Sequence, residues 1–285
     1  MKHFQAALLS ALALTQAVLA EFSYTIEATH NGVPIPQDQI KLEAHEPTTD
    51  ILNRTWAPSP PSSKPPSRTG KRSNPVSISA NWCGAVKHTN SSNQIKIVHG
   101  YFQHPTCSLR SGVTSYPQYA APWVGIDGDT WTSAILQSGT VCTVSSAGAV
   151  SNSAWFQWFP SAAVTISSMP VNAGDWFEVT VNTTSNTAGK VTITNVSQGV
   201  TYTATLTGGA TLGRLDADWV LEDPVSSSGQ VPFASFTETW FESAYATTTS
   251  GASLGIDGAT MYQIGSSGTC QSAEYDNADL YVWSN

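Results

Sequence analysis

After residue 80, short runs rich in Val, Ile, Thr and aromatic residues alternate with polar positions. Gly, Ser, Asn or Pro separates the runs, and no long stretch has the period of a helix. The clearest runs lie at 94–102, 123–127, 133–139, 154–159, 176–184, 190–196, 200–206, 216–223, 236–241 and 278–283. This pattern predicts an all-β fold: a single antiparallel β-sandwich of the concanavalin or jelly-roll type.

Three of these runs carry polar side chains between their apolar positions. Successive residues of a strand point to opposite faces, so Ala217, Trp219 and Leu221 are expected in the core and their neighbours outside it. Polar and acidic groups among aromatic rings on one face suit an extended polymer, either peptide or polysaccharide. The face of 216–223 away from the core then holds Asp216, Asp218, Val220 and Glu222. In the other two runs, one face holds Ser133, Ile135 and Gln137, and one face holds Trp155, Gln157 and Phe159.

The first 72 residues differ in composition from the rest. Residues 1–20 combine the basic Lys2, an apolar stretch too short for a confident membrane span, and small residues before Ala20, which predicts a secretory signal peptide. Residues 21–72 include the Pro/Ser/basic stretch "PSPPSSKPPSRTGKR", which ends in the dibasic pair Lys71-Arg72. Secretory processing proteases cut at such pairs, so we interpret 21–72 as a propeptide and 73–285 as the mature domain.

The predicted mature domain is acidic. It holds five basic and 14 acidic residues, a net charge of 5 − 14 = −9. Such a surface disfavours nucleic acid and anionic membranes as partners. Because few groups become cationic at low pH, positive self-repulsion stays limited when carboxylates are protonated. We therefore expect a secreted, extracellular monomer suited to acidic surroundings.

Cysteines and glycosylation sequons agree with secretion. The predicted mature domain contains an even number of cysteines: Cys83, Cys107, Cys142 and Cys270. In a secreted chain they predict two disulfides, with three pairings open, and the lack of any Cys-x-x-Cys spacing argues against a metal site. Glycosylation candidates are Asn53, Asn90, Asn182 and Asn195.

Several kinds of hydrolase are disfavoured. "GASLG" places Ser253 in a GxSxG pattern, but the histidine of that motif must follow the serine, whereas His88, His99 and His104 all precede it. The zinc motif HExxH is absent, and there is no duplicated Asp-Thr-Gly of an aspartic protease. Carboxylates, amides and aromatic rings remain as the candidate chemistry, with no cofactor.

Six segments occur in a distinctive order: "NWCG" (81–84), "WVGIDGD" (123–129), "AILQSG" (134–139), "AWFQWFP" (154–160), "WVLED" (219–223) and "VPFASF" (231–236). Together they resemble the glutamic peptidases, or eqolisins, a family of secreted fungal acid proteinases. The resemblance spans nearly all of 73–285. It implies a pepstatin-insensitive acid endopeptidase that acts on proteins and peptides and is made as a zymogen.

The resemblance also implies a catalytic dyad of Gln137 and Glu222. Hydrolysis of an amide needs a base for water, an acid for the leaving nitrogen and a donor to the oxyanion. Glu222 would take the proton from water and return it to the amine, and Gln137 would donate its side-chain N–H. An amide does not titrate, so it still donates in acid, where a histidine with a reference pKa of about 6.5 is cationic.

Other roles carried over by the resemblance concern the surroundings of the dyad. Asp127 resembles an aspartate that orients the catalytic glutamate; a turn residue before Gly128 is the other interpretation. Trp123 and Trp155 resemble aromatic walls of the substrate cleft, with core packing as the alternative. Gln157 stands where a glutamate is expected in the family, so a third carboxylate is missing from the cleft.

One disulfide known from some family members is also missing. Cysteines expected just after "GDT" and nine residues before the catalytic glutamate are replaced here by Trp131 and Gly213. The four cysteines of this chain therefore pair in a different way, which the resemblance does not assign.

Two other functions remain open. A jelly-roll glycoside hydrolase would use paired carboxylates, and a carbohydrate-binding sandwich would stack Trp and Tyr on sugars without catalysis. Both leave the dibasic pair and the "AILQ" segment without a role. The carboxylates available for a glycosidase are Glu178, Glu222, Glu238 and Glu242.

The prosegment is expected to inhibit its own domain. Its basic cluster from Lys64 to Arg72 would face the acidic domain near neutral pH, and His30 and His45 would become charged as the pH falls. Acid would then weaken the attraction and release the cleft.

Overall fold

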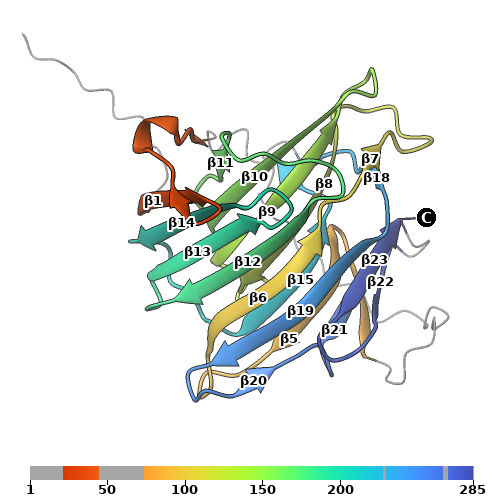
Figure 1. Cartoon of the computed structure of the whole chain (residues 1–285). Coiled ribbons are helices and arrows are strands. Elements are labelled where there is room, and N and C mark those ends of the chain that lie inside the picture. Colours follow the sequence, from red (N-terminus) through yellow and green to blue (C-terminus); the bar gives the residue numbers. More distant parts are fainter. Residues whose placement is uncertain (1–21, 45–73, 227–228, 266–268, 285) are drawn as a thin grey trace, which may run out of the picture.

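The structure, a computed structural model of the chain, describes residues 22–44, 74–226, 229–265 and 269–284 (Figure 1). The predicted signal peptide, the dibasic pair Lys71-Arg72, His45 and Asn53 lie outside these residues. Within them no helix is long and apolar enough to cross a membrane.

The strands form two packed layers, which we call sheet I and sheet II (Figure 1). Sheet I runs in spatial order through β1 (Ser23–His30), β14 (Val200–Thr207), β13 (Ala188–Asn195), β12 (Trp176–Thr183), β6 (Ile95–Gln103), β19 (Thr239–Thr248), β23 (Leu280–Ser284) and β22 (Cys270–Glu274).

Sheet II carries the segments of the predicted site. Its order is β3 (Glu43–Ala44), β11 (Val164–Ile166), β10 (Val150–Phe159), β9 (Ile135–Val144), β8 (Gln118–Ile126), β15 (Asp216–Glu222), β5 (Trp82–His88), β21 (Thr260–Ile264) and β4 (Val76–Ser79). A pair between β21 and β22 links the sheets. The predicted antiparallel sandwich is confirmed, with one parallel pair, β4 and β21.

Short elements complete the described chain: β2 (Val33–Pro34), the 3-10 helix η1 (Gln37–Gln39), β7 (Cys107–Ser108), β16 (Val225–Ser226), β17 (Gly229–Gln230), β18 (Ser235–Phe236) and β20 (Ser253–Leu254). β2 and β20 extend sheet I, whereas β16–β17 and β7–β18 form separate two-stranded pairs.

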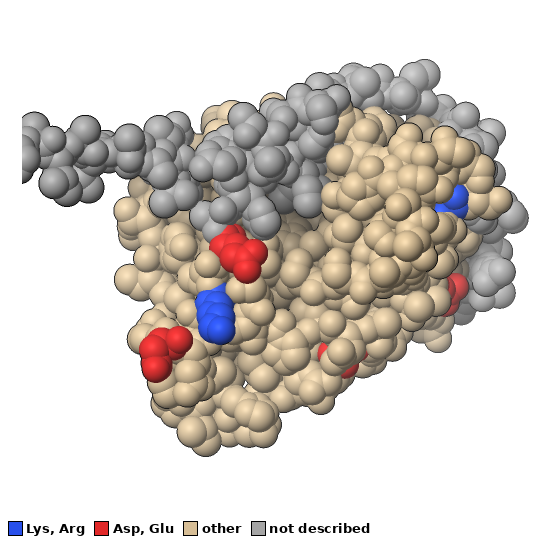
Figure 2. Space-filling view, turned by 90° about the horizontal axis from the view of Figure 1, so that it is seen from above, with Lys and Arg blue, Asp and Glu red and all other residues tan. Residues whose placement is uncertain are grey.

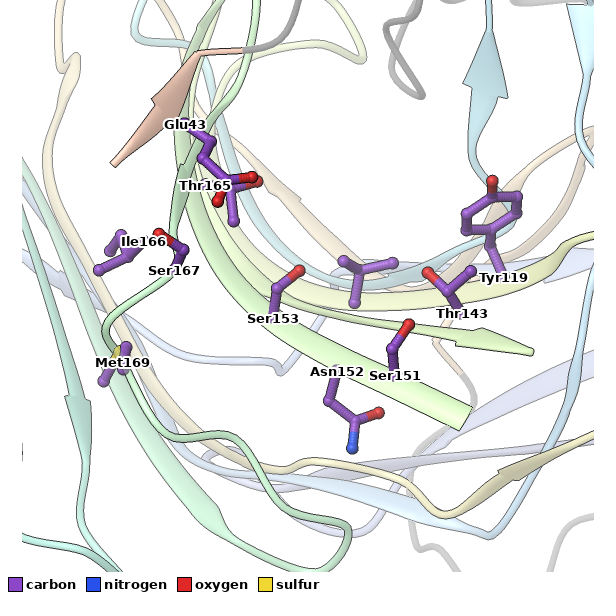
Figure 3. A pocket seen from close by; sticks show the side chains of 11 residues that line it. Glu43, Tyr119, Thr143, Ser151, Asn152, Ser153, Thr165, Ile166, Ser167 and Met169 are labelled. Carbon is purple, nitrogen blue, oxygen red and sulfur yellow. The ribbon is translucent and has the colours of Figure 1, made fainter. Parts of the chain in front are cut away.

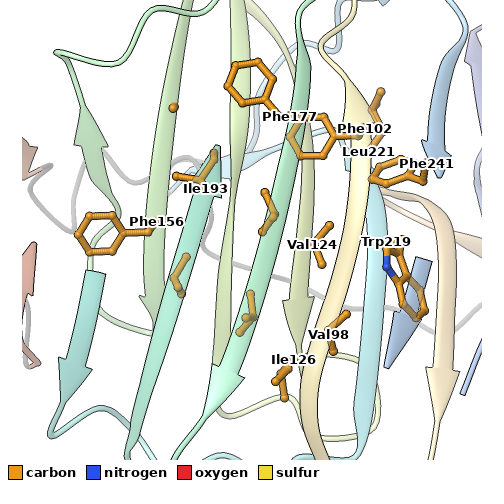
Figure 4. Packing of buried hydrophobic residues seen from close by; sticks show 14 of the residues in the cluster. Val98, Phe102, Val124, Ile126, Phe156, Phe177, Ile193, Trp219, Leu221 and Phe241 are labelled. Atoms are coloured by element: carbon orange, nitrogen blue, oxygen red, sulfur yellow. The ribbon is translucent and has the colours of Figure 1, made fainter. Parts of the chain in front are cut away.

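The inner faces of the two sheets enclose the main core (Figure 4). Sheet I contributes a row of rings in which Phe102 lies 5.7 Å from Phe177 and 5.9 Å from Phe241. From sheet II, Trp219 and Leu221 are fully buried against this row. The predicted alternation of β15 is therefore confirmed.

Two disulfides connect distant parts of the sandwich. Cys83 of β5 pairs with Cys270 of β22, which are 187 residues apart in the chain, and Cys107 pairs with Cys142 of β9. The first bridge ties sheet II to the strand at the edge of sheet I. Cross-links that close long loops restrict the unfolded chain and so favour the folded one.

The two positions expected to lack a disulfide are in direct contact. The ring of Trp131 lies on Gly213 so closely that a Cβ added to this glycine would be 2.5 Å from Cδ2 of the ring. The indole Nε1 donates a hydrogen bond to the carbonyl of Thr211 (2.9 Å). An aromatic ring packed on a glycine thus occupies the place of the bridge.

We expect Gly213→Ala to lower the free energy of unfolding by about 1–3 kcal/mol, because the added methyl overlaps the Trp131 ring. Chemical denaturation measures the change. In a Trp131→Ala background the same substitution should cost much less, and an equal cost in both backgrounds would show that the overlap is not its cause.

The structure separates the glycosylation candidates. Asn90 is exposed in a turn, and Asn182 is half-buried in β12. Asn195 is fully buried, and its amide donates to the carbonyl of Pro170 and to Asp175, both at 2.8 Å. The prediction that Asn195 accepts a glycan is therefore wrong, because a sequon ignores the burial of the strand that holds it.

Candidate active site

The predicted site residues lie together on the outer face of sheet II. Gln137 is paired with Gly125 and Gln157, and Glu222 with Trp82 and Ala121. Residues directly opposite each other on neighbouring strands share a face. This face carries its own buried cluster, distinct from the main core: Trp82, Val86, Trp123, Ile135, Trp155, Ala163, Val220 and Tyr262.

The Glu222 carboxylate is fully buried and accepts hydrogen bonds from three side-chain N–H groups. Asn81 Nδ2 (2.8 Å) and Trp82 Nε1 (3.2 Å) donate to Oε1, and Trp123 Nε1 (2.8 Å) donates to Oε2. Charge-assisted donors of this kind stabilise an ionised carboxylate. The arrangement holds Glu222 in one orientation and surrounds both of its oxygens with N–H donors.

The orientation of the Gln137 amide is determined by Gln157. Gln157 Nε2 donates to the carbonyl of Ser161 (2.9 Å), so its Oε1 is turned toward Gln137 and accepts from Gln137 Nε2 (2.7 Å). Within the described part of the chain, Gln137 Oε1 is buried without a hydrogen-bond partner. An unpaired buried carbonyl costs about 1–3 kcal/mol, and such costs recur at functional sites.

The Trp123 indole lies between Glu222 and Gln137. Its Nε1 bonds Glu222, while its Cζ3 lies over Gly125, whose added Cβ would be 2.8 Å from Cζ3 and 3.0 Å from Gln137 Cβ. The two dyad residues therefore lie at opposite ends of one indole. Trp155 is paired with Gly139 and belongs to the cluster of the outer face. Both tryptophans thus pack on this face, and neither belongs to the core between the sheets.

We expect Gly125→Ala to reduce kcat/KM at least about tenfold with a small loss of stability. The new methyl would displace both Trp123 and Gln137, and displacements near 1 Å can cost about 10²-fold in rate. Peptide hydrolysis in acid measures the effect. Gly189→Ala is a matched control, because its methyl would clash with Leu136 at 2.6 Å on the core side. Equal activity losses in the two variants would contradict this account.

Asp127 does not orient Glu222, so that prediction is wrong. It follows the end of β8 with a positive φ of 71°, and its carboxylate accepts hydrogen bonds from the backbone N–H groups of Arg214 (2.8 Å) and Leu215 (2.7 Å). Asp127 therefore holds the entry to β15, the strand that carries Glu222. Asn81, Trp82 and Trp123 take the predicted orienting role instead.

A second buried carboxylate fixes the turn after β8. Asp216 accepts hydrogen bonds from the backbone N–H groups of residues 129–131 and contacts His88 Nδ1 at 3.1 Å. The bonds from His88 and from Thr130 lower the pKa of Asp216, although burial opposes this, and the hydrogen bond to Asp216 raises the pKa of His88. The pair therefore stays ionised in mild acid.

Two other carboxyl groups are shifted in the opposite direction. Burial raises the pKa of Asp127 to about 7, and burial raises the pKa of Asp223 to about 8, with the adjacent Glu222 adding to the shift. Both groups are therefore neutral in acid, which leaves Glu222 beside an uncharged neighbour. Asp223 also accepts a hydrogen bond from Gln230 Nε2 at 2.6 Å.

A groove of about 510 Å³ lies on the outer face of sheet II (Figure 3). The register places Thr143, Ser151 and Ser153 on the same face as Trp155 and Gln157, one or more residue pairs further along β9 and β10. Hydroxyl groups dominate its wall. Its lining consists of Glu43, Tyr119, Val141, Thr143, Ser151, Asn152, Ser153, Thr165, Ile166, Ser167 and Met169.

The other carboxylates proposed for a glycosidase are not gathered around Glu222. Glu178 and Glu242 lie on sheet I, where both are paired with Tyr101, and Glu178 bonds His99 Nε2 at 3.1 Å. Glu238 lies just before β19 and bonds the indole of Trp240. Among the described residues, no group of three His, Cys, Asp or Glu side chains is arranged to hold a metal ion.

Sequence reasoning missed three contributors to the site. Asn81 and Trp82 bind Glu222, but the segment "NWCG" contains no sequence signal of these hydrogen bonds. Tyr262 is the third: its hydroxyl donates to Asp129 (2.8 Å) and its ring meets Trp82 edge-on at 6.3 Å. It lies on β21, far along the chain, and only the strand pairing brings it here.

Comparison with known proteins places the chain in a family. The sequence model of the Peptidase A4 family matches residues 80–283. Aspergillopepsin-2 of Aspergillus niger is 34% identical over 208 residues, which cover 67% of this chain and 72% of the relative. The chain therefore belongs to the Peptidase A4 family, the glutamic peptidases, and is an endopeptidase of that class.

Solved structures agree with this assignment. Scytalido-glutamic peptidase, crystallised with a transition state analog inhibitor, matches with a TM-score of 0.62 and 27% identity, over 72% of this chain and 98% of that chain. SCP-B, an eqolisin in complex with the tripeptide Ala-Ile-His, matches with a TM-score of 0.58 and 25% identity over the same shares. The predicted resemblance is confirmed.

Proposed function

We propose that the protein is a secreted acid endopeptidase in which Glu222 and Gln137 hydrolyse peptide bonds without a cofactor. The observation that carries the proposal is the pairing of a carboxylate held by three N–H donors with an oriented amide at the other end of the Trp123 indole. Membership of a peptidase family supports the reaction class.

In the proposed reaction, water attacks the carbonyl carbon of the scissile bond while Glu222 takes its proton. The spare N–H of the Gln137 amide donates to the oxygen that becomes negatively charged, and the unpaired Oε1 accepts from the water. Glu222 then gives the proton to the leaving nitrogen as the C–N bond breaks. No proton is gained or lost over the cycle.

The groove supports an extended peptide as substrate. Thr143, Ser151 and Ser153 of its lining share the face of Gln137, and its hydroxyl groups can hydrogen-bond a peptide main chain (Figure 3). The family member solved with a bound tripeptide favours the same class of substrate. A glycosidase would need a second carboxylate beside Glu222, but Glu178 and Glu242 lie on the other sheet, sheet I.

We also propose that the chain is made as a zymogen. Glu222 and Gln137 are fully buried in the full-length chain, so a substrate does not reach them before a rearrangement or a cut. Cleavage after Arg72 and removal of the prosegment would provide that change. The two disulfides are in keeping with a secreted protein.

The decisive test is an assay of the processed protein on a denatured protein at pH 3 with pepstatin present. We expect peptide release, detected by mass spectrometry, at sites within the substrate chain. Release of sugars from polysaccharides without peptide release would favour the glycosidase instead, and neither product would support the carbohydrate-binding sandwich.

A further inference from the structure

We propose that residues 22–44 are a docking anchor for the prosegment, which binds the free edges of both sheets and ends beside the groove on sheet II. This inference rests on the proposal that the chain is a zymogen. It identifies the strands of the domain to which the prosegment binds. The anchor lies outside the family domain, since the family match begins at residue 80.

The first part of the anchor extends sheet I. All eight residues of β1 pair in register with β14, from Ser23 opposite Thr207 to His30 opposite Val200. Tyr24, Ile26 and Ala28 alternate toward the core, and the Tyr24 ring meets Phe156 edge-on at 5.2 Å. An uncovered edge strand presents unpaired N–H and C=O groups that accept an added strand.

The turn after β1 packs against Gly199, in the loop before β14. Asn31 N–H donates to the carbonyl of Gly199 at 2.7 Å. A Cβ on Gly199 would be 2.0 Å from Asn31 Oδ1, and the φ of +68° also favours glycine there. The loop before β14 is thus shaped to receive this turn.

The last part of the anchor crosses to sheet II. Lys41 N–H donates to Ser168 Oγ (2.9 Å), and Ser167 Oγ donates to the Lys41 carbonyl (3.1 Å). β3 then pairs with β11, with Glu43 opposite Thr165. Glu43 lines the groove, at the rim seen in Figure 3. One segment of 23 residues therefore joins both sheet edges and ends beside the proposed substrate channel (Figure 1).

The contacts of the anchor are backbone hydrogen bonds and apolar packing. Across the described residues, no ion pair joins 22–44 to the rest of the chain, and His30 is exposed. Its docking should therefore be equally strong in acid and near neutral pH. Tethering raises the effective concentration of the connected inhibitory residues at the face, so inhibition depends on strands that touch no catalytic group.

The test uses the full-length chain with Glu222→Gln, which prevents self-digestion, cut after Arg72 by an endoprotease specific for dibasic sites. Gel filtration and mass spectrometry then measure, across a dilution series at pH 6 and pH 3, how much prosegment stays with the domain. Tyr24→Ala and Ile26→Asn remove anchor contacts without adding a group that titrates between pH 3 and pH 6. Glu27→Gln changes an outward-facing residue of the same strand and serves as the control.

We expect the unchanged segment and the Glu27→Gln segment to bind alike. The Tyr24→Ala and Ile26→Asn segments should dissociate at concentrations at least about tenfold higher, by the same ratio at both pH values. The domain is identical in all preparations, so any difference belongs to the segment. Equal retention of all four segments would contradict the anchor proposal. The proposal would also be contradicted if the variant and unchanged segments differed at pH 6 but not at pH 3. Because binding is measured without catalysis, the result does not depend on the peptidase proposal.

Discussion

Glu222→Gln should lower kcat/KM for peptide hydrolysis at pH 3 by about 10³-fold or more. The substitution keeps the size of the side chain but removes the only group proposed to take a proton from water, and general acid–base catalysis typically contributes about 10²–10⁴-fold. Gln137→Ala removes one oxyanion donor and should cost about 10²–10³-fold. Initial rates on a fluorogenic peptide, measured on processed protein, give both values.

A matched control separates chemistry from folding. Glu178→Gln makes the same change on sheet I, where the carboxylate bonds His99, and should leave kcat/KM within about twofold. Thermal unfolding of each variant checks that the fold persists. Unchanged activity in Glu222→Gln or in Gln137→Ala would remove that residue from the dyad, and an equally large loss in Glu178→Gln would show that the assay does not separate the dyad from a distant carboxylate.

The sandwich and the outer face of sheet II could be predicted because both rest on local alternation. The period of two in 216–222 assigns Trp219 to the core and Glu222 to the opposite face, and the structure keeps that assignment. A strand with one buried face has a strongly specified register, since a shift by one residue would exchange the two faces. Such patterns can be recognised without knowing which strands are neighbours.

The partners of each side chain could not be predicted in this way. Asp127 follows β8 and Glu222 belongs to the neighbouring strand β15, yet Asp127 bonds the backbone just before the start of β15 whereas Glu222 lies at its end. Asn81 reaches Glu222 only because β5 and β15 pair, 141 residues apart in the chain. These contacts depend on strand order and turn geometry. The alternation of apolar and polar residues along a strand predicts neither.

The prosegment shows the same limit. Its Pro/Ser/basic stretch indicates an extended segment, but the alternation of Tyr24, Ile26 and Ala28 earlier in the prosegment is typical of a strand. The structure pairs Ser23–His30 with β14 over eight residues. The electrostatic account of acid release, which relies in part on His30, receives no support from the described anchor contacts and stays a prediction for the remaining residues.

The free energy of unfolding should fall as the pH rises from 4 to 8. The folded-state pKa is raised from 3.8 to about 7 for Asp127 and to about 8 for Asp223, so the folded chain holds protons that the unfolded chain has released. Stability from such groups is fully present below the unfolded pKa and is lost as the pH passes through the folded pKa. The shifts correspond to roughly 4 kcal/mol for Asp127 and roughly 6 kcal/mol for Asp223, a large part of the stability of a domain.

Asp223→Asn separates this effect from general charge repulsion. Asn imitates the neutral carboxyl group and can still accept from Gln230, so the variant should lose much less stability between pH 4 and pH 8 than the unchanged chain. Urea denaturation at pH 4, 6 and 8 measures the slopes. Asp216, whose pKa is lowered by His88, contributes in the opposite sense, and its loss should limit stability only in stronger acid. Equal slopes in the variant and the unchanged chain would mean that Asp223 is ionised in the folded protein, and the acid preference would then have to come from the net charge of the domain.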